Sequence, residues 1–290
     1  MPAVEPSFER YNLPVHTLAD TSCITSESLG TKFVCRFRES LPEDLYFLSY
    51  LRPGGILFVT FHGAVRRGVD TYPRFDRVGS LRKAGVPFLA FADPTISVDE
   101  ELELGWYLGG SGWDPKDAIV SVIDAVKTAC DAKGVCLIGG SGGGFAALRV
   151  SREIPQSLAF VFNPQVRLRD YIPRVKDLYF SKLYSRDSEA VINDSPAGLY
   201  DLSVSYQGGC HPNFVYFLQN LTDVSHLKNH YKPFKDAVGI SGIHGVDPTG
   251  SIRMELIDSS RVGHSPPSPE EFDQHLSTAL DWYKDVVSLR

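Results

Sequence analysis

Six residues near the middle of the chain restrict its possible folds more than any other feature. The segment Gly139-Gly140-Ser141-Gly142-Gly143-Gly144 directly follows an apolar run at residues 135–138, and a helix-forming stretch follows it at 145–150. A strand, a sharp turn with the pattern G-x-S-x-G and a helix, in this order, are the context of a nucleophile elbow. Glycines are needed because side chains flanking the serine would collide with the neighbouring strand and helix. The pattern predicts that the Ser141 hydroxyl stands above a sheet, beside the amide of Gly142.

Other glycine-rich motifs fit this segment less well. A dinucleotide-binding fingerprint that begins at Gly140 requires a glycine where Phe145 stands. A phosphate-binding P-loop requires a lysine before the serine or threonine, and none is nearby. A glycine-rich turn that only packs a helix against a sheet is the remaining alternative. The nucleophile is the interpretation we favour, because strand, serine and helix stand in the required order.

Short apolar runs alternate with helical patterns over residues 56–287. Nearly unbroken apolar runs of this length are typical of strands that are buried on both faces. They lie at residues 56–61, 86–91, 135–138, 158–162 and 214–218, and a weaker run lies at 252–257. Between and after them, apolar residues recur with helical spacing at 119–130 and 272–287. The alternation predicts an α/β fold with a mostly parallel central sheet that helices cover on both faces.

The spacing of these runs indicates the organisation of the 290 residues. We expect a single domain over 1–290, with a β-rich N-terminal segment at 1–55 that includes an alternating strand at 32–38. About 50 residues separate the strand ending at Asn163 from the one starting near Phe214, more than an ordinary crossover requires. We therefore expect residues 165–212 to form a lid or insertion.

Composition excludes several classes of protein. The net charge is −6 and the pI about 5.8, which argues against a nucleic-acid binder held by phosphate contacts. No apolar run approaches the length of a membrane span, and the first six residues lack the charged start and apolar run of a signal peptide. Five cysteines without a CxxC pair predict reduced thiols rather than a disulfide scaffold or zinc ribbon. The expected compartment is the cytoplasm.

A serine nucleophile needs a base and an acid that orients the base. His264 lies in a short loop between the last strand and a final helix that opens with a capping box at Ser268, so the fold would bring it to the serine's edge of the sheet. Asp223 follows the preceding strand, and the chain order Ser141, Asp223, His264 suits this kind of turn. Asp223 is the acid that we favour, although it also resembles the N-cap of a helix starting at Val224, which would be a structural role.

These residues and one more motif resemble the α/β-hydrolase superfamily. The similarity covers about residues 56–287, and it includes His62-Gly63-Ala64 after an early strand. In that family the amide that follows such an H-G motif helps to hold the oxyanion, which here implies the amides of Ala64 and Gly142. The resemblance also implies a lid insertion after the sixth strand. His62-Gly63-Ala64-Val65 departs from the lipase H-G-G-G pattern, and for His62 we favour a structural role that supports the loop.

Several further residues are candidates for ligand contacts. Trp106, Tyr107 and Trp113 stand among glycines and could line a cavity, or else cover the core. Arg66, beside the expected oxyanion loop, suggests a negatively charged substrate. Basic residues of the insertion, interrupted by acidic ones, are better explained as a solvated helix face. Asp223, His226 and His230 would share one helix face that could hold a metal, but a polar surface is the simpler account, and we expect no metal site.

Taken together, these residues predict a serine hydrolase that cleaves a carboxylic ester through Ser141, His264 and Asp223 and an acyl-enzyme. An acyltransferase that moves the acyl group to a sugar or another hydroxyl, as in bacterial surface-glycan assembly, is the alternative. A non-catalytic hydrolase-like module that binds a partner is a third possibility. No cofactor is implied. The expected substrate is a small-molecule or glycan ester, and the oligomeric state is left open.

Overall fold

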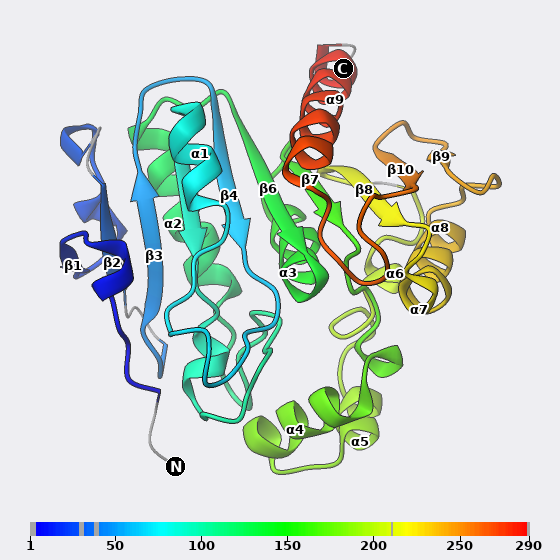
Figure 1. Cartoon of the computed structure of the whole chain (residues 1–290), viewed down its shortest axis with the longest axis horizontal. Coiled ribbons are helices and arrows are strands. Elements are labelled where there is room, and N and C mark those ends of the chain that lie inside the picture. The colour runs from blue at the N-terminus through cyan, green and yellow to red at the C-terminus, as the bar shows by residue number, and fades with distance from the viewer. Residues whose placement is uncertain (1–3, 29–31, 38–40, 210, 289–290) are drawn as a thin grey trace.

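The computed structural model describes residues 4–28, 32–37, 41–209 and 211–288. Within them, ten strands form one sheet in the order β1-β2-β3-β5-β4-β6-β7-β8-β10-β9 (Figure 1). The strands are β1 Val15–Leu18, β2 Lys32–Phe37, β3 Leu45–Tyr50, β4 Ile56–Phe61, β5 Phe88–Phe91, β6 Gly134–Gly140, β7 Leu158–Phe162, β8 Phe214–Asn220, β9 Gly245–Val246 and β10 Ile252–Ile257.

The centre of the sheet is parallel. Strands β5, β4, β6, β7, β8 and β10 are neighbours in this order, and each pair runs in the same direction. Antiparallel pairing is confined to β3 with its two neighbours and to β9 at the far edge. The expected α/β class with a mostly parallel sheet is confirmed. The carboxyl ends of the parallel strands consequently meet at one edge, where loops from distant parts of the chain come together.

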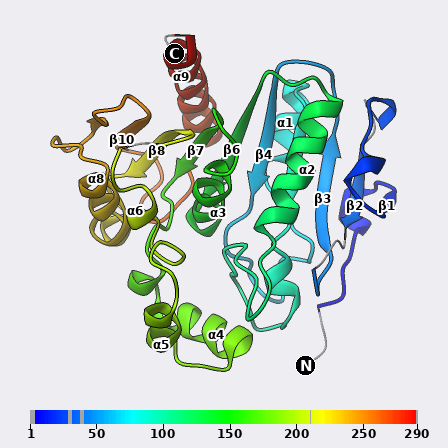
Figure 2. The same cartoon turned by 180° about the vertical axis from the view of Figure 1, so that it is seen from behind.

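Helices cover both faces of this sheet. In Figure 1, α1 and α9 lie in front of the strands, and Figure 2 shows α2 and α3 on the opposite face. The helices are α1 Val78–Ala84, α2 Lys116–Ala129, α3 Ser141–Ser151, α4 Pro173–Tyr184, α5 Ser188–Asp194, α6 Leu202–Ser205, α7 Val224–His226, α8 Lys232–Ala237 and α9 Pro269–Ser288. A π-helical turn, Leu227–Tyr231, joins α7 to α8.

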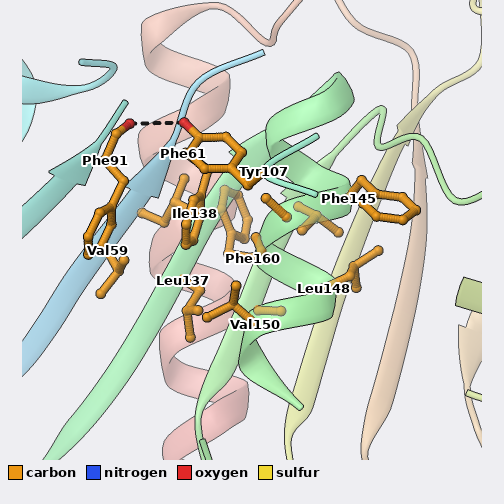
Figure 3. Packing of buried hydrophobic residues seen from close by; sticks show 14 of the residues in the cluster. Val59, Phe61, Phe91, Tyr107, Leu137, Ile138, Phe145, Leu148, Val150 and Phe160 are labelled. Atoms are coloured by element: carbon orange, nitrogen blue, oxygen red, sulfur yellow. Dashed lines mark hydrogen bonds between the residues drawn. The ribbon is translucent and has the colours of Figure 1, made fainter. Parts of the chain in front are cut away.

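Packing in the core explains why the sequences of the central strands are unbroken apolar runs. Side chains on both faces of β4, β6 and β7 are buried, because α3 packs on one face and α9 closes the other (Figure 3). The hydroxyl of Tyr107 donates to the carbonyl of Phe91 over 2.9 Å, which joins the loop before α2 to the end of β5. Residues that contribute include Val59, Leu137, Ile138, Phe160 and, from α3, Phe145 and Leu148. This rigid centre holds the residues at the carboxyl edge.

The long connection between β7 and β8 contains three helices, α4, α5 and α6. Helices α4 and α5 lie beyond the carboxyl ends of the strands, at the bottom of Figure 1. The connection was expected after the sixth strand, but it follows the seventh in chain order. Two strands were missing from the expectation: β1, which is short and mostly exposed, and β3, whose side chains are buried.

Other expectations from the sequence can be compared with the described residues. The strand expected at 32–38 is β2, and Arg38 lies outside the described residues. Cys23, Cys130 and Cys136 are free thiols, whereas the Cys35 side chain and Cys210 are outside the described part. None of the helices in the described ranges combines the length and hydropathy that crossing a bilayer requires.

Candidate active site

Ser141 lies at the turn from β6 into α3. Its φ of +54° is in the left-handed region, which is a strained conformation for a residue with a side chain and one that recurs at functional sites. Close packing explains the neighbouring glycines. A Cβ atom on Gly139 would collide with the backbone of Gly143, and one on Gly143 would collide with the carbonyl of Phe61. The turn is therefore the sharp strand–turn–helix that the glycine cluster predicted.

His264 lies in the loop between β10 and α9. Its Nε2 is 2.9 Å from Ser141 Oγ, although 123 residues separate the two in sequence. Its Nδ1 is 2.6 Å from Asp223 Oδ2. The side chain is 39% exposed, so water and small molecules reach the imidazole. The structure thus brings together the three residues that the sequence predicted as nucleophile, base and acid.

Glu271, in the first turn of α9, fixes both ends of the His264 loop. Its carboxylate accepts hydrogen bonds from the backbone N–H groups of Ser260 (2.7 Å) and Ser268 (2.8 Å). The Ser268 hydroxyl in turn accepts from the Glu271 N–H at 3.2 Å, which completes the capping box expected there. Hydrogen bonds from backbone N–H groups hold the pKa of Glu271 down to about 2. The carboxylate is therefore ionised, and strengthens these bonds, over the whole physiological range.

Asp223 performs the capping and the orienting task at once. Its Oδ1 accepts from the backbone N–H of His226 at 3.3 Å, as the N-cap of α7, while Oδ2 faces His264. Asp223 is buried, which raises the pKa of its carboxyl group, but hydrogen bonds from His226 and His264 outweigh burial. The pKa of Asp223 therefore lies below its ordinary value, and the carboxylate is charged at neutral pH.

A second imidazole, that of His226, lies against His264. The two rings stack with centroids 4.0 Å apart and planes 14° apart. Nδ1 of His226 is 3.2 Å from Asp223 Oδ1, while its Nε2 is buried and has no hydrogen-bond partner among the described residues. Burial lowers the pKa of His226, so the ring is neutral and donates from Nδ1 to the carboxylate. Asp223 consequently accepts from two histidines, which holds it in place.

Gln165 contacts Ser141 directly, and the sequence did not indicate it. Its side-chain Nε2 donates to Ser141 Oγ at 2.9 Å, and its backbone N–H donates to the Ser141 carbonyl at 3.0 Å. Its Oε1 accepts from the indole N–H of Trp106. Because Gln165 is fully buried, these bonds hold the amide in one orientation. A glutamine in a connection has no local pattern that marks it, so only the folded chain identifies it.

The loop after β4 lies against the serine turn. A Cβ atom built on Gly63 would lie 3.3 Å from the Gly140 carbonyl and 3.5 Å from Ser141 Cβ, so the two loops touch. Among the described residues, no hydrogen bond from the backbone N–H of Ala64 or Gly142 to another group is found. Both residues lie beside Ser141: Ala64 and Ser141 line one pocket, which is described below, and Gly142 follows Ser141 in α3. Neither amide is thus engaged by another group of the described residues.

His62 is a structural residue of that loop. Its ring is buried, with Nδ1 2.6 Å from the Gly63 carbonyl and Nε2 accepting from the backbone N–H of Asp93 at 3.0 Å. Burial lowers the pKa of His62, which keeps the ring neutral and suits one donor and one acceptor nitrogen. The backbone N–H of His62 donates to the Tyr107 hydroxyl at 3.0 Å. These contacts support the loop, as the sequence suggested for His62.

A pocket of about 490 Å³ opens above Ser141 and His264. The loop at Gly63 and Ala64 forms one side of it, and Phe162, Asn163 and Tyr171 form another. The remaining wall comes from three arginines, from Asp76 and from the proline-rich segment at the start of α9. It is large enough for a small molecule or for one or two sugar units.

The aromatic residues expected to line the cavity do not line this pocket. Trp106 and Tyr107 are buried in the core, and each is held by a hydrogen bond, to Gln165 and to Phe91 respectively. Trp113 is partly buried and lines a separate hollow next to Tyr200. The glycine-aromatic segment at residues 105–113 therefore packs beneath the site, where Trp106 and Tyr107 form part of the hydrophobic core.

The expected basic contact at Arg66 also lies elsewhere. Its side chain is 75% exposed, pairs with Asp70 and does not line the pocket. The basic residues of the insertion are engaged too, each in an ion pair within 4.0 Å. They are Arg167, Arg169, Arg174, Lys176, Lys182 and Arg186, with partners Asp170, Asp201, Glu189, Glu103, Asp99 and Asp194 among others. These pairs tie α4 and α5 to their surroundings.

The three residues considered for a metal site, Asp223, His226 and His230, make different contacts in the structure. His230 turns away from Asp223, and its Nδ1 accepts from the backbone N–H groups of Val166 and Arg167 at 3.3 Å. Ligand-type atoms of Asp223, His226 and His264 do lie within 4.8 Å of one another. In that group the Nδ1 atom of each imidazole lies within hydrogen-bond distance of the carboxylate.

No protein-family model matches the chain, and no curated protein matches its sequence. Solved structures do resemble it. The capsule O-acetyltransferase of Neisseria meningitidis serogroup A aligns with 87% of this chain and 96% of its own, with a TM-score of 0.56 and 15% identity. A mutant of that enzyme in complex with CoA aligns with 88% and 94%, with a TM-score of 0.58 and 16% identity.

An acetyl xylan esterase from Paenibacillus sp. R4 is also similar. It aligns with 90% of this chain and 92% of its own, with a TM-score of 0.51 and 16% identity. Identities this low establish the architecture and leave the substrate open. The strand order, the serine turn after β6 and these neighbours agree, and the chain has the α/β-hydrolase fold.

Proposed function

We propose that the protein transfers acyl groups from carboxylic esters through a Ser141-centred acyl-enzyme, with water as the acceptor. The observation that carries this proposal is the continuous chain of contacts from Ser141 Oγ to His264 Nε2 (2.9 Å) and from His264 Nδ1 to Asp223 Oδ2 (2.6 Å), at the floor of an open pocket. Side chains that distant loops bring into this order form the arrangement that activates a serine.

The first half-reaction acylates the serine. Because ionised Asp223 accepts from Nδ1, Nε2 of His264 is left as the base. Ser141 Oγ bonds to the ester carbonyl carbon as its proton passes to Nε2, and the carbonyl oxygen gains the negative charge. The amides of Ala64 and Gly142 donate to that oxygen. The intermediate collapses, the bond to the alcohol oxygen breaks, and that oxygen takes the proton from Nε2.

The second half-reaction returns the free enzyme. A water molecule gives a proton to His264 Nε2 and bonds to the acyl carbon, and the second tetrahedral intermediate expels Ser141 Oγ. The serine recovers its proton from His264, and a carboxylic acid leaves. The partial exposure of the imidazole supports this step, since water reaches it directly.

An acyltransferase is the second candidate function. A hydroxyl group then replaces water in the second half-reaction, and the product is a new ester. The observation that favours it is the capsule O-acetyltransferase, whose own chain is aligned over 96% of its length. Both functions use the same residues and differ only in the acceptor.

Covalent labelling tests the shared part of the proposal. A fluorophosphonate should label the wild type and should not label Ser141→Ala, and His264→Ala should be labelled at least about 10³-fold more slowly. Ser121→Ala, which changes an exposed serine of α2, is the matched control and should be labelled like the wild type. Labelling that persists in Ser141→Ala would contradict the nucleophile. A wild type that stays unlabelled would favour the non-catalytic binding module.

Product analysis separates hydrolase from transferase. With 4-nitrophenyl acetate or acetyl-CoA as donor and a sugar as acceptor, a hydrolase releases acetate in proportion to donor consumed, whatever the sugar concentration. A transferase diverts the acetyl group into a sugar ester, in a fraction that rises with the sugar. The donor that gives the faster turnover also identifies the leaving group that the pocket accepts.

A further inference from the structure

Two arginines in the wall of the pocket have no role in the proposed mechanism. Arg77 precedes α1, and Arg261 stands three residues before His264 on the same loop. Both line the pocket that contains Ser141. They differ from the basic residues of the insertion, which face acidic partners elsewhere.

Arg77 is held in one position by its surroundings. Its φ of +64° is in the left-handed region, and its guanidinium lies 3.7 Å above the ring of Phe272 and 5.3 Å from that of Phe162. Stacking on two aromatic rings restricts the rotamers of this side chain, which lines the pocket. A donor group positioned in this way loses little entropy when it binds an anion.

The backbone of Arg261 is fixed by the site itself. Its carbonyl accepts from the Asn220 side-chain amide at 2.7 Å, and its N–H donates to the Ser259 hydroxyl at 3.2 Å. The side chain is exposed at the mouth of the pocket. The loop that positions His264 thus also positions Arg261.

The charges around the pocket do not balance. Its third arginine, Arg74, pairs with Asp76 (3.0 Å) and Asp70 (3.3 Å). For Arg77 and Arg261, by contrast, no ion pair within 4.0 Å is found among the described residues. Burial lowers the pKa of Arg77, the charges of Asp76 and Asp273 raise it, and the charge of Arg261 has a smaller lowering effect. Two cations without an ion-pair partner in the described residues therefore line this pocket, and the acidic residue that lines it, Asp76, pairs with Arg74.

We propose that Arg77 and Arg261 bind an oxyanion of the substrate, a carboxylate or a phosphate, so that the preferred ester carries a negative charge. This inference rests on the proposed function, because it assigns the substrate class of the same pocket. Guanidinium groups bind both anions through paired N–H donors, and such charge-assisted hydrogen bonds are about twice as strong as neutral ones. The anion would supply a counter-charge to Arg77 and Arg261.

Binding without catalysis is the first test. Inorganic phosphate and benzoate are titrated into Ser141→Ala protein by calorimetry. Saturable binding is expected, with affinity reduced about tenfold or more in Arg77→Gln and in Arg261→Gln. Arg82→Gln, which changes an exposed arginine of α1, is the control and should bind like the parent. If Arg77→Gln does not fold, Arg77→Lys is titrated instead, and anion binding that it retains through its positive charge supports the interpretation. The absence of binding, or equal binding by all variants, would overturn the proposal.

Catalysis with matched esters is the second test. Phenyl acetate, 4-acetoxybenzoate and 4-acetoxyphenyl phosphate differ in the charge opposite the ester. We expect kcat/KM to be at least about tenfold higher for an anionic ester than for phenyl acetate, that preference to be lost in Arg261→Gln, and the control Arg82→Gln to keep it. The two anionic esters distinguish a carboxylate from a phosphate.

The two proposals fail in different ways. If phenyl acetate is hydrolysed and neither anionic ester is preferred, the anion site is wrong and the hydrolase remains. If phosphate binds through Arg77 and Arg261 but no ester reacts and Ser141 resists labelling, the anion site remains and the hydrolase is wrong.

Discussion

At the scale of single residues, the two oxygens of Asp223 resolve a conflict that its position in the chain creates. A single acceptor atom could not both cap α7 and orient His264. The carboxylate instead turns Oδ1 to the backbone N–H of His226 and Oδ2 to His264. The consequence is that stability and catalysis depend on different atoms of one side chain, and that substitutions can separate them.

Asp223→Asn and Asp223→Ala should separate these two tasks. The asparagine keeps an oxygen for the cap but places an amide where His264 needs an acceptor, which favours the wrong tautomer of the imidazole. We expect kcat to fall roughly 10³- to 10⁴-fold in both variants. Only the alanine also loses the cap, which should lower the free energy of unfolding by about 1 kcal/mol relative to the asparagine. Urea unfolding and steady-state turnover measure the two effects. Equal stability of the two variants would contradict the capping role.

The residues differ in how far the sequence could predict them. Ser141 has a local motif, and Asp223 and His264 follow strands whose carboxyl ends must meet at one edge, so chain order made them the preferred candidates. Gln165, His226 and Arg77 have no such signal. Each contacts the site through a side chain whose direction depends on packing between segments far apart in sequence, such as Phe272 beneath Arg77. For Trp106 the sequence left a cavity wall and core cover as alternatives, since aromatics among glycines fit a core as well as a cavity.

At the scale of elements, the start of α9 and the end of β10 are joined by one carboxylate. Glu271 binds Ser259 and Ser260 at the beginning of the His264 loop and Ser268 at its end. A loop of this length would otherwise sample many conformations, and only a few of them put Nε2 within reach of Ser141. The helix cap therefore serves the geometry of the site as well as the helix.

Replacing Glu271 should disturb catalysis from a distance. In Glu271→Ala the loop loses its clamp, so we expect kcat to fall roughly ten- to hundredfold with a smaller change in KM. The free energy of unfolding should fall by about 1 to 2 kcal/mol, because the capping box is lost as well. Glu270→Ala is the matched control: it removes an exposed glutamate in the same turn and should leave both quantities nearly unchanged. If the two variants behave alike, the loop is held by other contacts.

Predictability also differed among elements. The parallel strands could be predicted because burial on both faces leaves unbroken apolar runs, as at β4 and β6. The connection from β7 to β8 could be recognised by its length, yet its three helices could not be placed. Ion pairs and hydrogen bonds such as Arg174 with Glu103 and Tyr179 with the Gly109 carbonyl hold it, and such long-range contacts leave no periodic pattern.

At the scale of the whole molecule, buried histidines link stability to pH. His230 is 1% exposed, and its Nδ1 accepts from two backbone N–H groups, so protonation would remove an acceptor and bury a charge. Burial, with smaller effects of His226 and His264, lowers the pKa of His230 to about 3 from an ordinary value of 6.5. Between these two pKa values the imidazole of His230 is protonated in the unfolded chain and neutral in the folded chain. Stability due to this residue is complete above pH 6.5 and declines as the pH falls toward 3.

The size of this effect can be measured with His230→Asn, since the asparagine oxygen replaces the Nδ1 acceptor without titrating. One proton corresponds to about 1.4 kcal/mol per pH unit, so from pH 7.5 to 5.0 His230 should remove about 2 kcal/mol from the wild type and nothing from the variant. Urea unfolding at the two pH values gives the comparison, because the other histidines contribute equally to both proteins. His244→Asn, at an exposed position, is the control and should keep the wild-type dependence. If His230→Asn loses as much stability on acidification as the wild type, the prediction is contradicted. The folded protein would then bind a proton at His230 as readily as the unfolded chain does.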